Sequence, residues 1–325
     1  MTPREKFISA LRREKIVGHV PHFELVFFLT MEAVGRIHPI HRNYSQWYQM
    51  SRKEQKLHLR DMALAYIEVA EKYDHSAIFV HPNPSPIGEL PDDINATREI
   101  LETIRDISGD KYFLMIHGDP TYPIPTGDTM MEFAAQMYEE PEVIHEGTKK
   151  NMEFAMKLCD EMNKHDGLLD GWALCSDYCF NVNPFYNQEM FAELVQPYLK
   201  EILSYYRSKG YYSIKHTDGN VMPILDQIVD CKPDAVHSLD PQGHVDMKEA
   251  KRLYGDKVCL IGNVNCGLMQ TGTIEELEAD TRRALNEGMP GYGYIFSTSN
   301  CAYTGLDLER YEIMHNIWRT EGIYR

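Results

Sequence analysis

The chain of 325 residues lacks the features that would divide it, export it or place it in a membrane. It has no run of about 18 apolar residues, so no segment is expected to span a bilayer. No Gly/Ser linker, low-complexity tract or internal repeat separates one part from another, and the N-terminal stretch has no apolar core of signal-peptide length. The seven cysteines have irregular spacing, unlike a disulfide framework. These absences predict a single domain over residues 1–325 in the cytoplasm.

Positive charge is scarce. The chain has 33 Lys and Arg against 49 Asp and Glu, a formal net charge of −16. An acidic surface repels nucleic acid and anionic membranes, so neither is an expected partner. The sequence also lacks a GxGxxG after its first expected strand, and GxxxxGK[ST] does not occur. A small or neutral substrate is the better expectation.

What the sequence does contain is a regular alternation of strand and helix patterns. The expected strands are continuously apolar, which is typical of a parallel sheet covered by helices. Thr2, Pro3 and Glu5 form a capping-box pattern that begins an N-terminal helix. About eight strand–helix units in a chain of this length predict an α/β fold: a (β/α)8 TIM barrel, as a single domain with an N-terminal helical extension. The expected strands lie in "HVPHFELVFF", "HSAIFVHP", "YFLMIHGDP", "GLLDGWALCSD", "YYSIKH", "DAVHSLD", "KVCLIGNVN" and "GYIFSTSN", and the longer helices cover about 51–72, 93–107, 141–165, 187–208 and 307–320.

Polar and metal-binding residues recur where the expected strands end. Catalytic groups of (β/α)8 barrels come from the carboxyl ends of several strands, so these residues are candidates for one site. The candidates are Glu24, His81, His117, Asp119, Asp177, His216, Asp218, Asp240, Cys266 and Cys301.

Four of these residues predict a zinc site: His216, Asp240, Cys266 and Cys301. They follow successive strands, and zinc accepts imidazole, carboxylate and thiolate ligands in one shell, whereas Mg²⁺ and Ca²⁺ prefer oxygen alone. Each residue also has a structural interpretation, because an isolated His or Cys is often a core residue, and Asp218 or Asp240 can cap a helix or turn. The remaining cysteines are expected in the core: Cys159, Cys175, Cys179, Cys231 and Cys259.

Several stretches of the chain resemble the uroporphyrinogen decarboxylase-like superfamily, and within it the methyltransferase branch. They are "MTPREKFISALRREKIVGHVP", "FNVNPFYNQEMFAELVQPYLKEI", "HTDGNVMPILDQIVD", "LIGNVNCGLMQTGTIEELE" and "IFSTSNCAYTGLDLERYEIM", and together the similarity covers essentially the whole chain. Zinc methyltransferases of this superfamily use H-x-C and a distant Cys, and cobalamin-independent methionine synthase adds a Glu between them. Here the matching positions are His216, Asp218 in place of the Cys, Asp240 in place of the Glu, and Cys301.

The departure at Asp218 makes Cys266 the natural replacement ligand, a pattern similar to the methyltransferase component of corrinoid-dependent O-demethylases. The resemblance implies a zinc enzyme that moves a methyl group from a methylated oxygen, above all an aryl methyl ether, to the Co(I) of a separate corrinoid protein. A homodimer is compatible with this expectation. Candidate catalytic residues are Asp218, Glu24, His117 and Asp177. Aromatic residues near strand ends suit a flat substrate ring, with Phe23, Tyr122, Tyr178, Phe180 and Tyr186 as candidates.

Three alternatives remain open. A zinc enzyme could instead move methyl from a methylcorrinoid protein to a small thiol of the coenzyme M type, although that branch keeps the cysteine where this chain has Asp218. A uroporphyrinogen decarboxylase activity is less consistent, because "HFELVFFLTMEAVGR" lacks the arginine pair of the decarboxylase and the chain is acidic. A metal-free scaffold on a degenerate barrel is the third.

Overall fold

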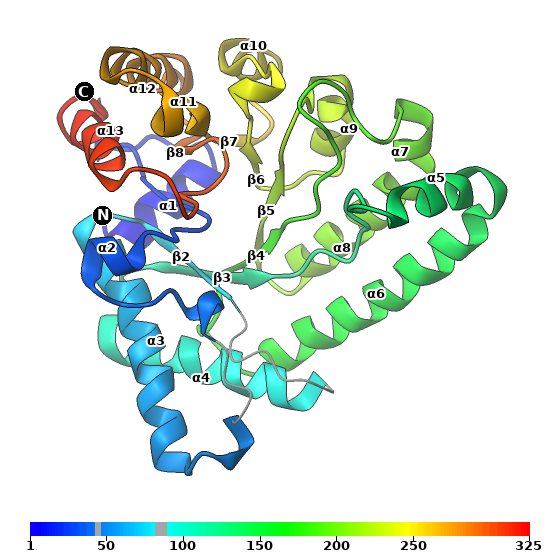
Figure 1. Cartoon of the computed structure of the whole chain (residues 1–325), viewed down its shortest axis with the longest axis horizontal. Helices are drawn as coiled ribbons and strands as arrows, with labels where there is room; N and C mark the ends of the chain where they lie inside the picture. The colour runs from blue at the N-terminus through cyan, green and yellow to red at the C-terminus, as the bar shows by residue number, and fades with distance from the viewer. Residues whose placement is uncertain (43–46, 82–89) are drawn as a thin grey trace.

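A computed structural model describes residues 1–42, 47–81 and 90–325, and its centre is a curved sheet of parallel strands surrounded by helices (Figure 1). Each strand pairs in parallel with the next one along the chain, in the order β2 to β8. Parallel neighbours require a crossover connection, and helices of the outer layer supply it. The strands are β2 (Ala77–Val80), β3 (Phe113–His117), β4 (Gly171–Leu174), β5 (Tyr212–Thr217), β6 (Ala235–Ser238), β7 (Cys259–Val264) and β8 (Tyr294–Thr298).

The seam between β2 and β8 is closed by the segment around His22, which occupies the position of a first barrel strand. His22 forms isolated parallel bridges to both His75 and Phe296. The backbone N–H of Ser76 donates to the oxygen of His22 at 2.7 Å, and the N–H of Phe23 donates to that of Phe296 at 3.1 Å. Pro21 has no N–H to donate, so a continuous ladder is not possible here. The (β/α)8 barrel is therefore confirmed, while its first strand is reduced to single bridges.

The helices lie outside the barrel and largely match the predicted ranges, with two differences. The range 187–208 is two helices, because Pro197 cannot donate the hydrogen bond that would continue one. An additional helix, α5, precedes the predicted helix at 141–165. The α-helices are α1 (Pro3–Leu11), α2 (Thr30–Val34), α3 (Arg52–Lys72), α4 (Leu90–Ser108), α5 (Thr129–Glu139), α6 (Pro141–Met162), α7 (Gln188–Leu194), α8 (Gln196–Ser208), α9 (Leu225–Asp230), α10 (Met247–Tyr254), α11 (Cys266–Thr271), α12 (Ile274–Gly288) and α13 (Leu308–Glu321).

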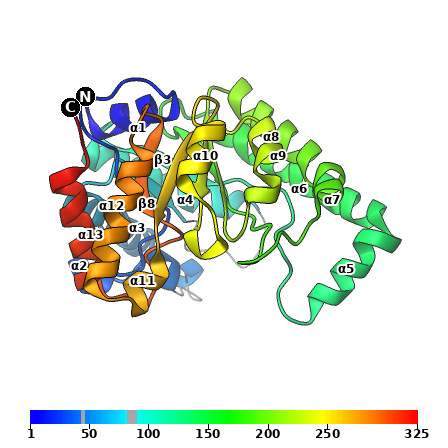
Figure 2. The same ribbon diagram turned by 90° about the horizontal axis from the view of Figure 1, so that it is seen from above.

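Helix α1 covers the amino end of the barrel. Its predicted capping box is present, with the Glu5 N–H donating to Thr2 Oγ1 at 3.1 Å and the Thr2 N–H donating to the Glu5 carboxylate at 2.7 Å. The Phe7 ring packs against Phe23 and Phe113, at centroid distances of 5.6 and 4.8 Å. Figure 2 shows α1 at the opposite end of the molecule from α5 and α11. The carboxyl ends of the strands thus form the end of the barrel away from α1.

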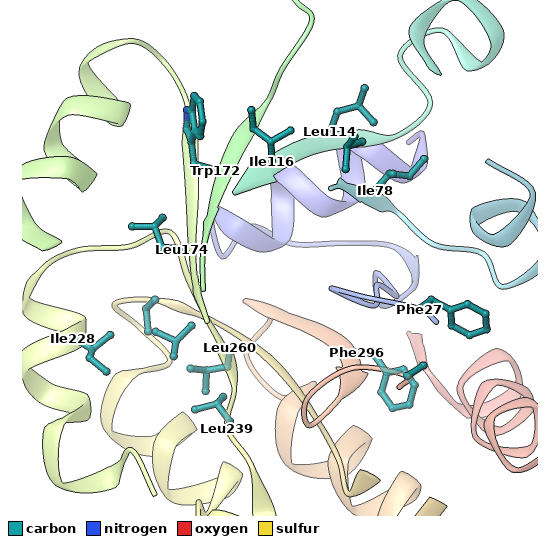
Figure 3. Packing of buried hydrophobic residues seen from close by; sticks show 14 of the residues in the cluster. Phe27, Ile78, Leu114, Ile116, Trp172, Leu174, Ile228, Leu239, Leu260 and Phe296 are labelled. Carbon is teal, nitrogen blue, oxygen red and sulfur yellow. The ribbon is translucent and has the colours of Figure 1, made fainter. Parts of the chain in front are cut away.

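Two apolar clusters fill the molecule. The inner cluster consists of residues such as Phe113, Met115 and Ile214, which face the barrel axis together with α1. The outer cluster lies between the strands and the helices, and it includes Leu114 and Ile116, which alternate with the inner pair along β3 (Figure 3). In the described part of the chain, no helix combines the length and the apolar character needed to span a bilayer.

Candidate metal centre at the carboxyl end of the barrel

Asp177, His216 and Asp218 converge beyond the ends of β4 and β5. His216 Nε2 lies 3.7 Å from Asp177 Oδ1 and 3.7 Å from Asp218 Oδ1. Within residues 1–42, 47–81 and 90–325, these three side chains are the one group of three or more His, Cys, Asp or Glu whose ligand atoms all lie within 4.8 Å of one another. We call this group the triad. All three residues belong to the candidates that the sequence placed at strand ends, and Asp177 lies with His216 and Asp218.

The orientation of His216 is fixed by a second histidine, His237. The two residues are register partners on β5 and β6, and their Nδ1 atoms are 2.8 Å apart, so one nitrogen donates and the other accepts. Both rings are buried, and burial beside His216 holds the pKa of His237 well below its usual range. His237 Nε2 is buried without a hydrogen-bond partner among the described residues. In the tautomer in which His216 Nδ1 is the donor, a lone pair remains on His216 Nε2, on the side of the two carboxylates.

Asp218 is held by hydrogen bonds from two further strand ends. Ser238 Oγ donates to Asp218 Oδ1 at 2.7 Å, and the Asn300 side-chain amide donates to Oδ2 at 2.5 Å. Burial raises the pKa of Asp218 to about 6 in spite of the nearby His216, and the carboxylates of Asp177 and Asp240 add to the rise. The raised pKa of this half-buried carboxyl shows that its charge is disfavoured by its surroundings, and a positive charge beside it would lower the pKa.

The donor set is compatible with a metal ion, and its nitrogen and oxygen donors are ligands that zinc accepts. A nitrogen lone pair and two carboxylates repel one another unless a positive charge lies between them. In a tetrahedral zinc shell, ligand distances near 2.1 Å place neighbouring ligand atoms about 3.4 Å apart, which is close to the separations found here. The hydrogen bond from His216 Nδ1 to a neutral partner is the usual support for a metal-binding imidazole.

A buried ion pair beside the triad fixes the ends of three strands. Lys215 Nζ is 2.7 Å from Asp119 Oδ2 and donates to the carbonyl oxygen of Ser176 at 2.8 Å, and both charged side chains are fully buried. Asp119 in turn accepts the backbone N–H of Ser176 at 2.9 Å and the hydroxyl of Thr121 at 2.6 Å. Burial alone would raise the pKa of Asp119, but Lys215 and Thr121 outweigh it and lower the pKa to about 2. Because Lys215 precedes His216 and Ser176 precedes Asp177, this pair positions two members of the triad.

The other predicted zinc ligands end the next three strands without joining a group of triad dimensions. Asp240 caps a short 3-10 helix through the Gln242 N–H, and burial raises its pKa. Cys266 and Cys301 are neighbours, with Cys266 Sγ 3.7 Å from the carbonyl oxygen of Cys301. Burial raises the pKa of Cys266 to about 12, and burial with Cys266 and Asp218 nearby raises that of Cys301 as well. Their role as ligands stays a prediction.

Of the predicted catalytic residues, Glu24 and His117 occupy very different places. Glu24 is buried at the seam, where its carboxylate accepts from Thr298 Oγ1 at 2.5 Å and lies 3.6 Å from His22 Nε2. His117 is exposed at the end of β3. His81 ends β2 near His38, with ring centroids 5.4 Å apart.

The predicted aromatic residues fall into core and surface positions. Phe23 packs in the inner cluster next to α1, away from the triad. Tyr178 is buried under Lys215 Nζ, which lies 4.0 Å from its ring centroid, and Tyr186 donates to the backbone oxygen of Tyr122 at 3.2 Å. Phe180, three residues after Asp177, is 42% exposed and is the member of this set with a free surface.

Sequence reasoning did not identify His237, Ser238, Asn300 or Lys215 as part of the site. Ser238 and Asn300 follow the same rule as the other candidates, since they lie at strand ends, but short polar side chains are common there. His237 was visible only as a histidine inside the strand pattern "DAVHSLD". Its meaning depends on the register of β5 against β6, which a single sequence does not specify.

These features define a class: an α/β barrel with an imidazole–carboxylate site of metal-binding character at the carboxyl ends of its strands. The model of the family described as "Uroporphyrinogen decarboxylase (URO-D)" matches residues 121–320. The chain belongs to this family, as its sequence resemblance predicted. A search of curated protein sequences finds no match.

Solved structures share the fold at low sequence identity. A methyltransferase from Methanosarcina mazei is 16% identical, with a TM-score of 0.71 over 99% of this chain and 99% of that chain. A GH5_18 from Bifidobacterium longum subsp. infantis is 8% identical, with a TM-score of 0.50 over 95% of this chain and 80% of that chain. At these identities the likeness concerns the fold alone.

The first prediction concerns the ion pair. Asp119→Asn leaves Lys215 buried without its counter-charge, so we expect a loss of about 3–5 kcal/mol in the free energy of unfolding at neutral pH. The pKa of Asp119 is lower in the folded state than in the unfolded chain, so its contribution is complete above about pH 4 and is lost as the pH falls through about 2. Chemical denaturation checks this, with Glu161→Gln of the exposed Lys164 pair as a control that changes little. Equal stability of both variants would contradict it.

The second prediction concerns His237. His237→Phe keeps a ring but removes the acceptor for His216 Nδ1–H, so zinc affinity should fall by about 10–100-fold. His237→Asn can offer an amide oxygen near the same position and should retain most of the affinity. Competition with a chromophoric chelator measures this, and the unfolding transition of the metal-free variants shows that both remain folded. Unchanged affinity in His237→Phe would mean that the pair does not orient His216.

Proposed function

We propose that the protein is a zinc-dependent methyltransferase that moves a methyl group from a methylated oxygen, above all an aryl methyl ether, to the Co(I) of a corrinoid protein. The observation that carries the proposal is the triad itself: a set of nitrogen and oxygen donors at the carboxyl end of the barrel. The resemblance to corrinoid-dependent O-demethylases supports the same activity, and the methyltransferase among the structures of similar fold is consistent with methyl transfer in general.

His216 is the proposed zinc ligand that both arguments share, because it belongs to the triad and to the set predicted from the sequence. Asp218 and Asp177 from the triad, and Asp240, Cys266 and Cys301 from the sequence pattern, compete for the remaining positions. A bound zinc ion would act as a Lewis acid toward the oxygen that carries the methyl group.

The chain's own residues would hold and orient the reacting groups. His237 fixes the ring of His216, and Ser238 and Asn300 fix both oxygens of Asp218. In the transfer, the bond between oxygen and methyl carbon breaks and the oxygen keeps the electron pair, while Co(I) supplies the pair that forms the bond to carbon. The phenolate then takes a proton from solvent, so no nucleophile from the protein is required.

A uroporphyrinogen decarboxylase activity is poorly supported although the chain belongs to that family. A porphyrinogen with many carboxylates needs cationic side chains around it. The connection after β3 and the one after β4 have no Lys or Arg over residues 112–148 and 165–199. Lys215, near the triad, is buried and paired with Asp119.

The third prediction identifies the ligands by metal analysis. Purified without chelator, the chain should carry about one zinc ion, and His216→Ala should lose it, because His216 is the donor common to both sets. Asp218→Ala should lose the ion as well if the triad holds it. Asp177→Ala and Cys301→Ala decide which set completes the shell, and Cys231→Ala, a buried cysteine after α9, serves as the control. Full zinc content in His216→Ala would overturn the site.

The fourth prediction concerns the substrate oxygen. Thiolate donates more charge to zinc than carboxylate does, and a less acidic ion is less suited to an ether oxygen. Asp218→Cys should therefore keep or tighten zinc binding while lowering demethylation, measured as methylcobamide formation with methoxyaromatics, methylamines and methanol as donors. An Asp218→Cys variant that demethylates as well as its parent would remove the support for ether chemistry, and a gain of transfer to a small thiol would favour the thiol methyltransferase.

A further inference from the structure

Helix α5 is an arm that presents an apolar stripe to solvent. Met131, Ala135 and Tyr138 are spaced i, i+4 and i+7, so they share one face of the helix, and all three are exposed. Met131 is 80% exposed and Tyr138 is 73% exposed. Figures 1 and 2 both show α5 at the edge of the molecule, beyond the end of α6. A helix of this kind normally buries such a stripe, which indicates a partner surface.

The stripe continues into a groove formed by a different part of the chain. Tyr138 lines a hollow of about 710 Å³ together with Asn183, Phe185, Met190, Pro223 and Ile224. Two exposed apolar side chains of the connection after β4, Phe180 and Val182, lie on the same part of the chain, at 42% and 61% exposure. We call the α5 stripe, this groove and these two side chains the arm surface.

The arm surface is joined to the triad through aromatic contacts. The Phe133 ring of α5 lies 6.2 Å from that of Phe185, which lies 6.0 Å from that of Phe180. Phe180 is three residues from Asp177 along the same connection. A molecule that docks on the arm surface therefore contacts the connection that carries a member of the triad.

Charge selects among the possible occupants. Residues 112–148 contain seven Asp and Glu and no Lys or Arg, and residues 165–199 contain five Asp and Glu and no Lys or Arg. On α5 itself, the exposed Glu132 and Glu139 flank the stripe. A symmetric contact with a second copy would place these carboxylates against one another, in a chain of net charge −16. A face with basic side chains around an apolar centre is complementary instead.

We infer that the arm surface is the docking site for a protein with such a basic, apolar-centred face, and that this partner carries the corrinoid acceptor; the second part rests on the proposed function. Docking there would bring the carrier to the connection that carries Asp177 of the triad. The occupant is a protein and not a small ligand, because the stripe lies on the exposed face of a helix and not in an enclosed pocket.

The test compares two acceptors, since free cob(I)alamin needs no docking surface whereas a corrinoid protein does. The probes are free cob(I)alamin and a panel of purified corrinoid proteins, all reduced to Co(I). Met131→Glu/Tyr138→Glu should raise the KM for a corrinoid protein by about tenfold or more and leave turnover with free cob(I)alamin unchanged. Val17→Glu/Leu57→Glu is the matched control, with the same added charge at two other exposed apolar positions, and should behave as the parent.

Charge is tested separately with Glu132→Lys/Glu139→Lys, which should weaken docking and reduce its dependence on salt. An equal loss with both acceptors would show that the stripe supports the fold, and the docking inference would fail. The docking inference would also fail if the parent protein binds no corrinoid protein of the panel. It would fail again if sedimentation shows that the parent is a dimer and that the Met131→Glu/Tyr138→Glu variant is not, because the occupant of the arm surface is then a second copy of the chain. If neither acceptor is methylated, the proposed function fails. Surface plasmon resonance with the same panel of corrinoid proteins then still tests the docking inference. Loss of binding in the arm variants alone supports the inference, and equal binding by these variants and the parent overturns it.

Discussion

The geometry of the site depends on one buried ion pair, Lys215 with Asp119. Two opposite charges in the apolar layer behind the barrel are costly to desolvate, and they are stable there because nearly every remaining donor and acceptor is satisfied by the ends of β3, β4 and β5. The same hydrogen bonds determine where the chain leaves each strand. Since Asp177 follows Ser176 directly and His216 follows Lys215, the pair fixes the backbone from which two triad side chains project.

On the inner side of the same strands, the electrostatic balance is the reverse. Asp177, Asp218 and Asp240 lie near one another, and the nearest imidazole, His216, points a lone pair toward two of them because His237 holds its other nitrogen. On the outer side of β5 the charges of Lys215 and Asp119 therefore balance, and on the inner side the negative charge exceeds the positive and favours a cation. This contrast between adjacent residues, Lys215 and His216, follows from the alternation of side chains along a strand.

Much of this arrangement could be predicted from the sequence. Unbroken apolar strands and helix caps predicted the barrel. Polar residues at strand ends gave the candidates for a site, and the structure brings Asp177, His216 and Asp218 of that set together, while the predicted zinc ligands Asp240, Cys266 and Cys301 lie outside the triad. Two features could not be predicted, for different physical reasons. The pairing of His216 with His237 depends on strand register, and the reduction of the first strand at Pro21 depends on which backbone groups find partners across the seam. Helix α5 went unpredicted because its exposed apolar stripe weakens the usual contrast between a buried and a solvated face.

Net charge is another property whose meaning changes between sequence and structure. From composition, an excess of acidic residues indicates only what the chain does not bind. Along the chain, however, Lys and Arg are missing from residues 112–148 and 165–199, and the fold brings these two ranges together through Phe133 and Phe185. These two ranges are therefore acidic, and they include Asp177 of the triad. A field of this sign stabilises a bound metal cation and attracts a basic protein, and it disfavours an anionic substrate such as a polycarboxylate. Under the proposed function, a neutral methyl ether would be little affected by this field and a phenolate product would be repelled, so the charge distribution that favours a metal cation would also favour release of the product.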